Sequence, residues 1–360
     1  MIKSKHRILV LLLVLGLVMS IVGCSSSSTP ANEPKPQEQT EQAAPAQNEE
    51  KPVIALSNSY YGNIWRKQMV DTFETAAKEA KDQGLIKDYM VLNGDGTQQQ
   101  QMTQLNDLIL KGVDVIAIDS ASPTALNGTI AKAQEAGIKV LSFDSIATEE
   151  NHYKLNFDFI KYGEDVAQYV VDHFNGKADV LIIRGVAGSA PDADMYKGMM
   201  NVLEKNSGMN IVGTVYGQAT TAVANKEVSS ILPSLKNVDA VICQGGGDSY
   251  GVVQAFQQAN REMPLITGDG SAEFTKWWYE ENQKGGYETL GLASTPGVGG
   301  AAFWVSLAIA EGKDVPKDML MPHARINQEE LDKYKDMEPN SIVSPVFTKE
   351  WVEENIISKK

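Results

Sequence analysis

Short apolar runs alternate with amphipathic stretches from residue 53 onward. Runs such as "VIAL", "YMVLN" and "DVIAID" are each followed by a segment with apolar residues at helical spacing, the first of which covers residues 64–82. Strands separated by helices are typical of βαβ units, because parallel strands need a long crossover connection. The pattern predicts an α/β fold built on parallel sheets.

This alternation occurs twice along the chain. Residues 53–145 and 178–270 follow one plan about 125 residues apart, with "GVDVIAIDS" matched by "NVDAVICQG" and "GIKVLSFD" by "EMPLITGD". Each half has the size of a domain. We therefore expect two doubly wound parallel-sheet lobes that face one another.

The N-terminal residues have the pattern of a secretory signal. A basic segment precedes the apolar run "ILVLLLVLGLVMSIVG", which is short for a membrane span. The run ends in "SIVGC", which resembles the lipobox of bacterial lipoproteins and implies that residues 1–23 are removed and Cys24 is lipidated. The alternative is a signal peptide that happens to contain Cys24.

Residues 24–51 are rich in Ser, Pro, Gln and Glu and contain almost nothing that could form a core. Such a composition predicts a disordered tether between a lipid anchor and the folded domain. We expect the protein to lie outside the cytoplasm, attached to the cell membrane through the lipid alone.

Charge and cysteine content narrow the range of functions. The net charge of the 360-residue chain is −14, and it becomes −17 once Lys3, Lys5 and Arg7 are removed with the signal. This balance excludes nucleic acid as an expected partner, because phosphate binding needs a basic surface. The second cysteine, Cys243, lies in the apolar run "DAVICQ" and is expected to be a buried small hydrophobe.

Polar and aromatic residues gather where the apolar runs end. Residues 57–66, Asp119 and Asp144 follow runs of the first half, while residues 184–194 and Asp269 follow runs of the second. Ligands of open α/β sheets bind beyond the carboxyl ends of the strands. Acids, amides and aromatic rings at this edge suit a neutral ligand with hydroxyl groups and an apolar face.

Catalytic, metal and nucleotide motifs are not found. The sequence has no P-loop, dinucleotide fingerprint, calcium loop or nucleophile elbow, and His152, His173 and His323 are scattered. We therefore expect no cofactor, no metal and no enzymatic activity.

Taken together, these features resemble the periplasmic binding protein family, and within it the ribose/galactofuranose-type sugar-binding lipoproteins of ABC importers. The likeness covers residues 53–357 and is carried by "GVDVIAIDSASPTAL", "AGIKVLSFDS", "NFDFIKYGEDVA" and "GLASTPGVGGAAFWVSLAIAEGK". It implies a type I periplasmic binding protein fold with a three-segment hinge. The N-terminal lobe would comprise residues 52–157 plus about 297–323, and the C-terminal lobe residues 158–296 plus about 324–360.

The resemblance also implies roles for individual residues. Asp144 and Asp269 match acids that bind sugar hydroxyls from opposite lobes, and Trp65 lies in a segment that covers the sugar ring. The helix start "GSAPDADMYKG" departs from ribose-type relatives, since Asp194 and its neighbours stand where an arginine is expected. The expected ligand-binding residues are Asn58, Tyr60, Tyr61, Trp65, Arg66, Asp119, Asp144, Asp194 and Asp269.

The function implied by the resemblance is that of a monomeric substrate-binding lipoprotein. It would capture a monosaccharide in the interlobe cleft and deliver it to the permease subunits of an ABC importer. A receptor for a small furanosyl or polyol signalling molecule is the main alternative. A secreted sugar-processing enzyme is disfavoured because a catalytic set is missing, and a repressor of the same plan would need an N-terminal DNA-binding motif.

Overall fold

The computed structural model describes residues 51–359. The predicted signal peptide, Cys24 and all but the last residue of the predicted tether lie outside them. The described residues belong to one compact unit. None of the helices in this part of the chain combines the length and the apolar character that crossing a bilayer requires.

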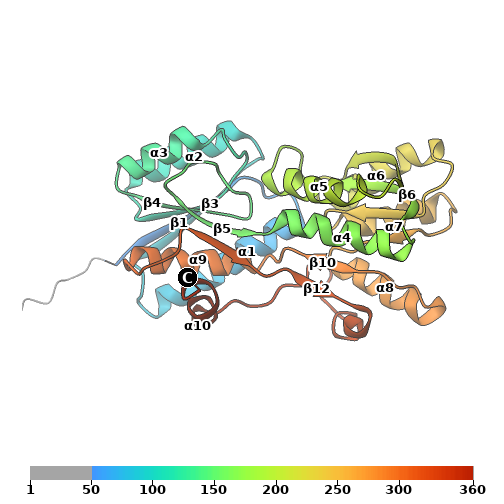
Figure 1. Cartoon of the computed structure of the whole chain (residues 1–360). Helices are drawn as coiled ribbons and strands as arrows, with labels where there is room; N and C mark the ends of the chain where they lie inside the picture. Colours follow the sequence, from blue (N-terminus) through green and yellow to red (C-terminus); the bar gives the residue numbers. More distant parts are fainter. Residues whose placement is uncertain (1–50, 360) are drawn as a thin grey trace, which may run out of the picture. The chain divides into compact units, whose positions relative to one another are not determined.

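A parallel sheet of six strands forms the centre of the first lobe, in the order β11-β5-β4-β3-β1-β2. Its helices lie on both faces (Figure 1), with α2 and α3 on one side and α1 and α9 on the other. The bounds are β1 Val53–Asn58, α1 Ile64–Asp82, β2 Asp88–Asn93, α2 Gln98–Lys111, β3 Val115–Asp119, α3 Asn127–Glu135, β4 Lys139–Phe143, β5 Tyr153–Phe157, α9 Val298–Ala310 and β11 Asp318–Met321.

The second lobe repeats this plan in the order β7-β6-β8-β9. A short antiparallel pair, β10 with β12, continues beyond β9 through a bridge between Gly268 and Gly291. The bounds are α4 Phe159–His173, β6 Lys177–Arg184, α5 Ala190–Leu203, β7 Gly208–Tyr216, α6 Thr221–Ile231, β8 Ala240–Cys243, α7 Asp248–Gln258, β9 Leu265–Ile266, α8 Ala272–Gly285, β10 Gly291–Ala293 and β12 Ala324–Ile326. The predicted fold of two parallel-sheet lobes is confirmed.

The cores follow from side-chain alternation along the central strands. In β6, Val180 and Ile182 pack toward α4 and α5, whereas Leu181 and Ile183 pack toward α6 and α7. Successive side chains of a strand point to opposite faces, so a central parallel strand has to be apolar on both. This explains why the strands appear in the sequence as continuous apolar runs.

The chain crosses between the lobes at the start of α4, before α9 and between β11 and β12. An aromatic cluster joins these crossings: the His323 ring stacks on Phe157 at 5.4 Å between centroids and meets the edge of Tyr162 at 5.3 Å. The Tyr162 hydroxyl donates a hydrogen bond to the carbonyl of Leu292 at 2.6 Å. Burial lowers the pKa of His323 to about 4, so its imidazole is neutral at physiological pH.

The C-terminal part differs from the predicted division of the lobes. Residues 341–343 pair with residues 270–272 of the second lobe. Helix α10 (Lys349–Val352) and the following turn η3 (Glu353–Ile357), however, contact α9 and β11 of the first lobe. Phe347, Val352 and Ile356 bury their side chains in the core that includes residues of α9 and β11. Burying this apolar surface is more favourable than leaving the segment exposed along the second lobe.

One glutamine of the first lobe bonds to this returning segment. Gln68 of α1 donates through Nε2 to the carbonyl of Ile342 at 3.0 Å, and its Oε1 accepts from the Ile342 N–H at 2.9 Å. Since Ile342 also forms a bridge with Ser271 at the start of α8, the pair connects the two lobes outside the crossings.

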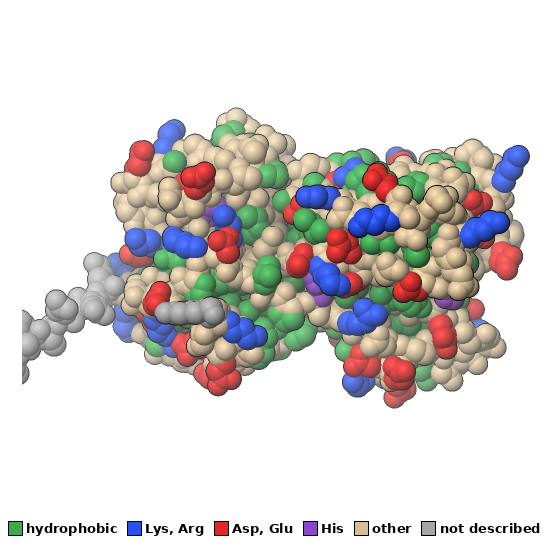
Figure 2. Space-filling model, in the orientation of Figure 1, with side chains coloured by type: hydrophobic (Ala, Val, Ile, Leu, Met, Phe, Trp, Pro, Cys, Tyr) green, Lys and Arg blue, Asp and Glu red, His purple; other side chains and the backbone are tan. Residues whose placement is uncertain are grey.

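Charged side chains of both signs are mixed on the face shown in Figure 2, and no extended basic area forms on it. This agrees with the acidic composition of the chain.

We predict that Gln68→Ala lowers stability by about 1–3 kcal/mol, because two backbone-directed hydrogen bonds are lost. Differential scanning calorimetry should show a melting temperature several degrees lower. Gln83→Ala, the same change at the exposed end of α1, is the control. Equal melting temperatures for the two variants would contradict a linking role for Gln68.

Candidate ligand-binding cleft

The first turn of α1 is set by a cap. Asn63 precedes the helix with extended backbone, and its side-chain Oδ1 accepts a hydrogen bond from the Arg66 N–H at 2.8 Å. This satisfies one of the free N–H groups at a helix start. Met69 and Phe73 anchor the helix in the core, so Trp65 and Arg66 lie at the carboxyl edge of the first sheet.

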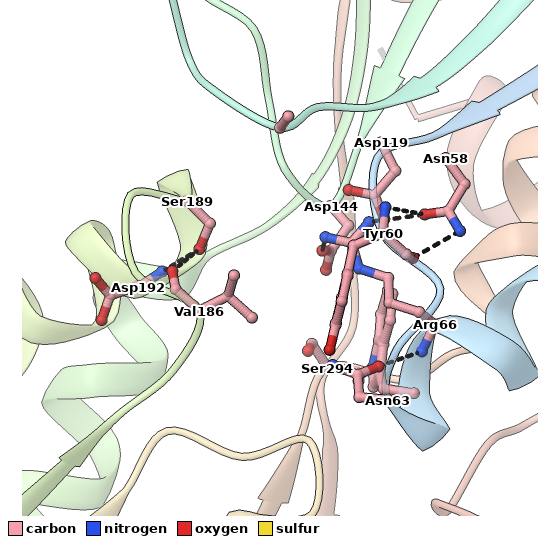
Figure 3. Close-up of polar contacts among 12 residues, drawn as sticks. Asn58, Tyr60, Asn63, Arg66, Asp119, Asp144, Val186, Ser189, Asp192 and Ser294 are labelled. Carbon is pink, nitrogen blue, oxygen red and sulfur yellow. Dashed lines mark hydrogen bonds and ion pairs between the residues drawn. The ribbon is translucent and has the colours of Figure 1, made fainter. Parts of the chain in front are cut away.

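Arg66 lies among polar groups from three neighbouring strand ends (Figure 3). It forms an ion pair with Asp119 at the end of β3 and donates from Nη1 to Asn58 Oδ1 at 3.3 Å. Its Nη2 lies 3.9 Å from an oxygen of Asp144, which follows β4. Parallel strands end at one edge of a sheet, and the register pairs Asn58 directly with Asp119.

The cluster holds two buried carboxylates and one buried guanidinium. Burial raises the pKa of Asp144 to about 6, and the nearby Arg66 opposes this increase. Burial also lowers the pKa of Arg66, an effect that Asp144 counteracts. Because Arg66 pairs closely with Asp119, Asp144 keeps a carboxylate without a hydrogen-bond donor among the described residues.

A cleft that is partly open to solvent lies in front of this cluster. Residues of both lobes and of the crossings line it: Asn63, Trp65, Arg66, Asp144, Phe159, Gly185, Val186, Ser189, Pro191, Asp192, Met195, Ala219, Gln244, Gly245, Gly246 and Ser294.

Trp65 connects the first-lobe wall to a crossing. Its indole Nε1 donates to the carbonyl of Ser294 at 2.6 Å, and the Arg66 guanidinium carbon lies 5.5 Å from its ring centroid. The indole therefore has a fixed orientation on the cleft wall, which suits contact with the apolar face of a ring.

The expected residues Asn58 and Asp119 lie behind the wall, where they hold Arg66. Tyr60 is beside Asp144 in Figure 3, although it is not among the lining residues. Tyr61 is 38% exposed and does not line the cleft.

In the second lobe, the acid at the cleft is Asp192 and not the expected Asp194. Ser189 caps α5 by accepting from the Asp192 N–H, which places Asp192 in the first turn. Arg184 at the end of β6 donates to both Asp192 oxygens, at 2.9 and 2.6 Å. Asp194 is two residues further on and therefore lies about 200° around the helix, away from the lining set.

Asp269 is buried and does not line the cleft. Its carboxylate accepts from the N–H groups of Gly247 at 2.6 Å, Ser271 at 2.9 Å and Ser249 at 3.4 Å. The backbone of Gly247 has a φ of 111°, which a residue with a Cβ rarely adopts. Asp269 thus organises the "GGGD" loop behind the wall.

Several lining residues were not predicted, among them Asn63, Asp192, Gln244 and Ser294. The sequence did contain a signal for two of them, since Asn63 and Ser189 are helix-capping residue types directly before helical patterns. Within residues 51–359, no group of three or more His, Cys, Asp or Glu side chains is arranged to hold a metal ion. Cys243 is buried, and burial raises the pKa of its thiol well above the usual value.

The sequence matches a known protein family over most of its length. The model of the periplasmic binding protein domain matches residues 54–314. The chain belongs to the periplasmic binding protein family. This is a family of substrate-binding proteins without catalytic activity, so the prediction that the chain is not an enzyme is confirmed.

Solved and curated relatives agree with this membership. An ABC transporter solute-binding protein from Thermobispora bispora is 36% identical, with a TM-score of 0.79 over 84% of this chain and 94% of that one. The multiple sugar-binding periplasmic receptor ChvE of Rhizobium radiobacter is 28% identical over 49% of this chain and 57% of its own length. The ribose import binding protein RbsB of Bacillus subtilis is 22% identical over 63% and 72%. The predicted resemblance to periplasmic sugar-binding proteins is confirmed, although the match spans little more than half of ChvE.

We predict that Asp144→Asn stabilises the ligand-free protein above pH 6. The raised folded pKa means that the stability contributed by Asp144 is present below about pH 4 and is lost as the pH rises through 6. Asparagine carries no charge, so the advantage of the variant in unfolding free energy should grow across this range to about 1–3 kcal/mol.

Denaturant titrations at several pH values measure this difference. Asp107→Asn, an exposed site on α2, controls for the general effect of the substitution. A difference between Asp144→Asn and the parent that stays constant from pH 4 to pH 7 would show that Asp144 is not held in a desolvated site.

Proposed function

We propose that this protein captures a neutral monosaccharide in the cleft between its lobes and delivers it to an ABC import permease. It would act outside the cytoplasm, attached to the membrane through a lipid on Cys24. The observation that carries the proposal is the buried Arg66–Asp119–Asp144 cluster, which leaves one carboxylate facing the cleft beside the indole of Trp65.

Asp144 and Trp65 offer what a sugar requires. The carboxylate can accept hydrogen bonds from two hydroxyl groups, each worth about 1.5–3 kcal/mol when the acceptor is charged. The indole covers the CH-rich face of a ring and excludes water. Micromolar affinity needs about 8 kcal/mol, so a few such contacts suffice.

The charges in the cleft favour a ligand without net charge. Arg66, the one cationic residue among those that line the cleft in the described part of the chain, is already paired with Asp119. A phosphate or carboxylate would have no free cation to bind and would face Asp144. The names of the relatives ChvE and RbsB, which refer to multiple sugars and to ribose, agree with a neutral sugar.

Ligand binding would favour a closed arrangement of the lobes. The wall on one side comes from α1 and the residues that precede it and that follow β4, and the wall on the other from α5 and the loops that follow β6 and β8. A ligand that contacts both walls stabilises the closed form by its differential contacts. The closed form would be the one that the permease recognises.

A polyol or furanosyl signalling molecule remains the second candidate. The observation that favours it is the second-lobe wall, where Asp192 and its neighbours differ from the arginine expected in ribose-type relatives.

We predict that Asp144→Ala lowers the affinity for the cognate sugar by about 10- to 100-fold, since one or more charged hydrogen bonds are lost. The full chain in detergent would first be screened by thermal shift against monosaccharides, polyols, nucleosides and amino acids. Calorimetric titration would then compare Asp144→Ala with Asp107→Ala, which should bind normally. Stabilisation by nucleosides or amino acids alone would contradict the proposal.

We predict that Cys24→Ser abolishes lipid attachment, because serine lacks the thiol that forms the thioether. Metabolic labelling with a radioactive fatty acid should mark the parent chain and not the variant. Cys243→Ser, at the buried second cysteine, should stay labelled. Label that persists in Cys24→Ser would contradict the proposed anchor.

A further inference from the structure

The two walls of the cleft differ in the polar groups that remain available to a ligand. The second-lobe wall contains three polar side chains, Ser189, Asp192 and Gln244, and each is bonded within the protein. The Ser189 hydroxyl donates to the Val186 carbonyl at 2.8 Å while it caps α5. The hydroxyl therefore has no hydrogen left to donate to a ligand.

Asp192 and Gln244 are held by a shared network. Both oxygens of Asp192 accept from Arg184, and Figure 3 shows this carboxylate directed away from the Arg66 cluster. Gln244 accepts from the Gly185 N–H at 2.7 Å and donates to the Asp192 carbonyl at 3.1 Å. The Arg184 guanidinium is itself enclosed by the rings of Tyr196 and Tyr216, at 4.3 and 4.8 Å.

What remains on this wall is apolar or lacks a side chain. Figure 3 shows Val186 between Asp192 and the Asp144 side of the cleft. The remaining lining residues of the second lobe are Gly185, Pro191, Met195, Ala219, Gly245 and Gly246.

The opposite wall and the crossing beside it retain free polar groups. The Asp144 carboxylate, the Asn63 amide nitrogen and the Ser294 hydroxyl have no hydrogen-bond partner among the described residues. None of the three groups is sealed from solvent, because none is among the buried atoms that lack a partner. Water or a ligand in the cleft has to satisfy them.

We propose that the ligand is a deoxy sugar, or a sugar bound with a methyl or methylene edge toward Val186 and its hydroxyl edge toward Asp144. This inference rests on the proposed function and specifies the class of sugar. A hydroxyl placed against Val186 would lose its water without gaining a side-chain partner there, whereas a methyl group gains from burial. An apolar wall discriminates against one added hydroxyl by at most about 100-fold.

Matched sugar pairs test the inference on the full chain in detergent. Calorimetric titration would compare D-galactose with 6-deoxy-D-galactose, L-mannose with 6-deoxy-L-mannose, D-glucose with 6-deoxy-D-glucose, and D-ribose with 5-deoxy-D-ribose. The deoxy member of at least one pair should bind about 10- to 100-fold more tightly than its partner. If the hydroxylated member binds equally or more tightly in every pair that binds, or if only sugars outside the panel bind, the inference is wrong while sugar binding stands. If no sugar binds, the proposed function fails as well.

A substitution tests the wall directly. Val186→Thr preserves the shape of the side chain and adds a hydroxyl, so it should reduce the preference for the deoxy sugar about tenfold or reverse it. Val346→Thr, at a site that is 85% exposed and outside the cleft, should leave the preference unchanged. An unaltered ratio in Val186→Thr, with a normal melting temperature, would show that this wall does not select the ligand edge.

Discussion

The first lobe depends on one buried guanidinium, that of Arg66. A buried cation is costly unless it is paired and hydrogen-bonded. Asp119 supplies the charge, Asn58 an acceptor oxygen and Asp144 a second, more distant carboxylate. These groups come from three strands that end at one edge, so the sheet register and the Asn63 cap together set the geometry. Because Arg66 pairs closely with Asp119 and lies further from Asp144, the Asp144 carboxylate can still accept hydrogen bonds from a ligand in the cleft.

The second lobe uses its acids differently. Asp269 occupies the corresponding strand end, yet its oxygens accept the backbone N–H of Gly247 in the glycine-rich loop and that of Ser271. Asp248 at the start of α7 accepts from the Gly245 N–H, and burial raises its pKa well above the usual value. The first lobe thus faces the cleft with partly unsatisfied polar groups, and the second with a wall whose polar side chains are already bonded. The same supersecondary plan supports two kinds of surface because the loops differ.

The two lobes are joined by more than the backbone crossings. The Trp65 indole bonds to Ser294, and Gln68, one turn further along α1, bonds to Ile342. The C-terminal segment then returns to the first lobe and packs on α9. Helix α1, which carries the proposed ligand contacts, is therefore bonded to two segments that connect the lobes. A movement of one lobe relative to the other would change the position of Trp65 and Arg66 in its first turn.

The sequence by itself determined the βαβ alternation, the internal repeat and the edge at which Trp65, Arg66, Asp119 and Asp144 gather. These features follow from local periodicity and from the rule that parallel strands end together. Only the tertiary structure decided that Asp192 and not Asp194 lies at the cleft, that Asp269 supports a loop, and that residues 349–357 pack on the first lobe. Each of these outcomes depends on which partners, such as Arg184, the Gly247 N–H or α9, lie nearby in space. Local sequence carries little information about such partners, because they are distant along the chain.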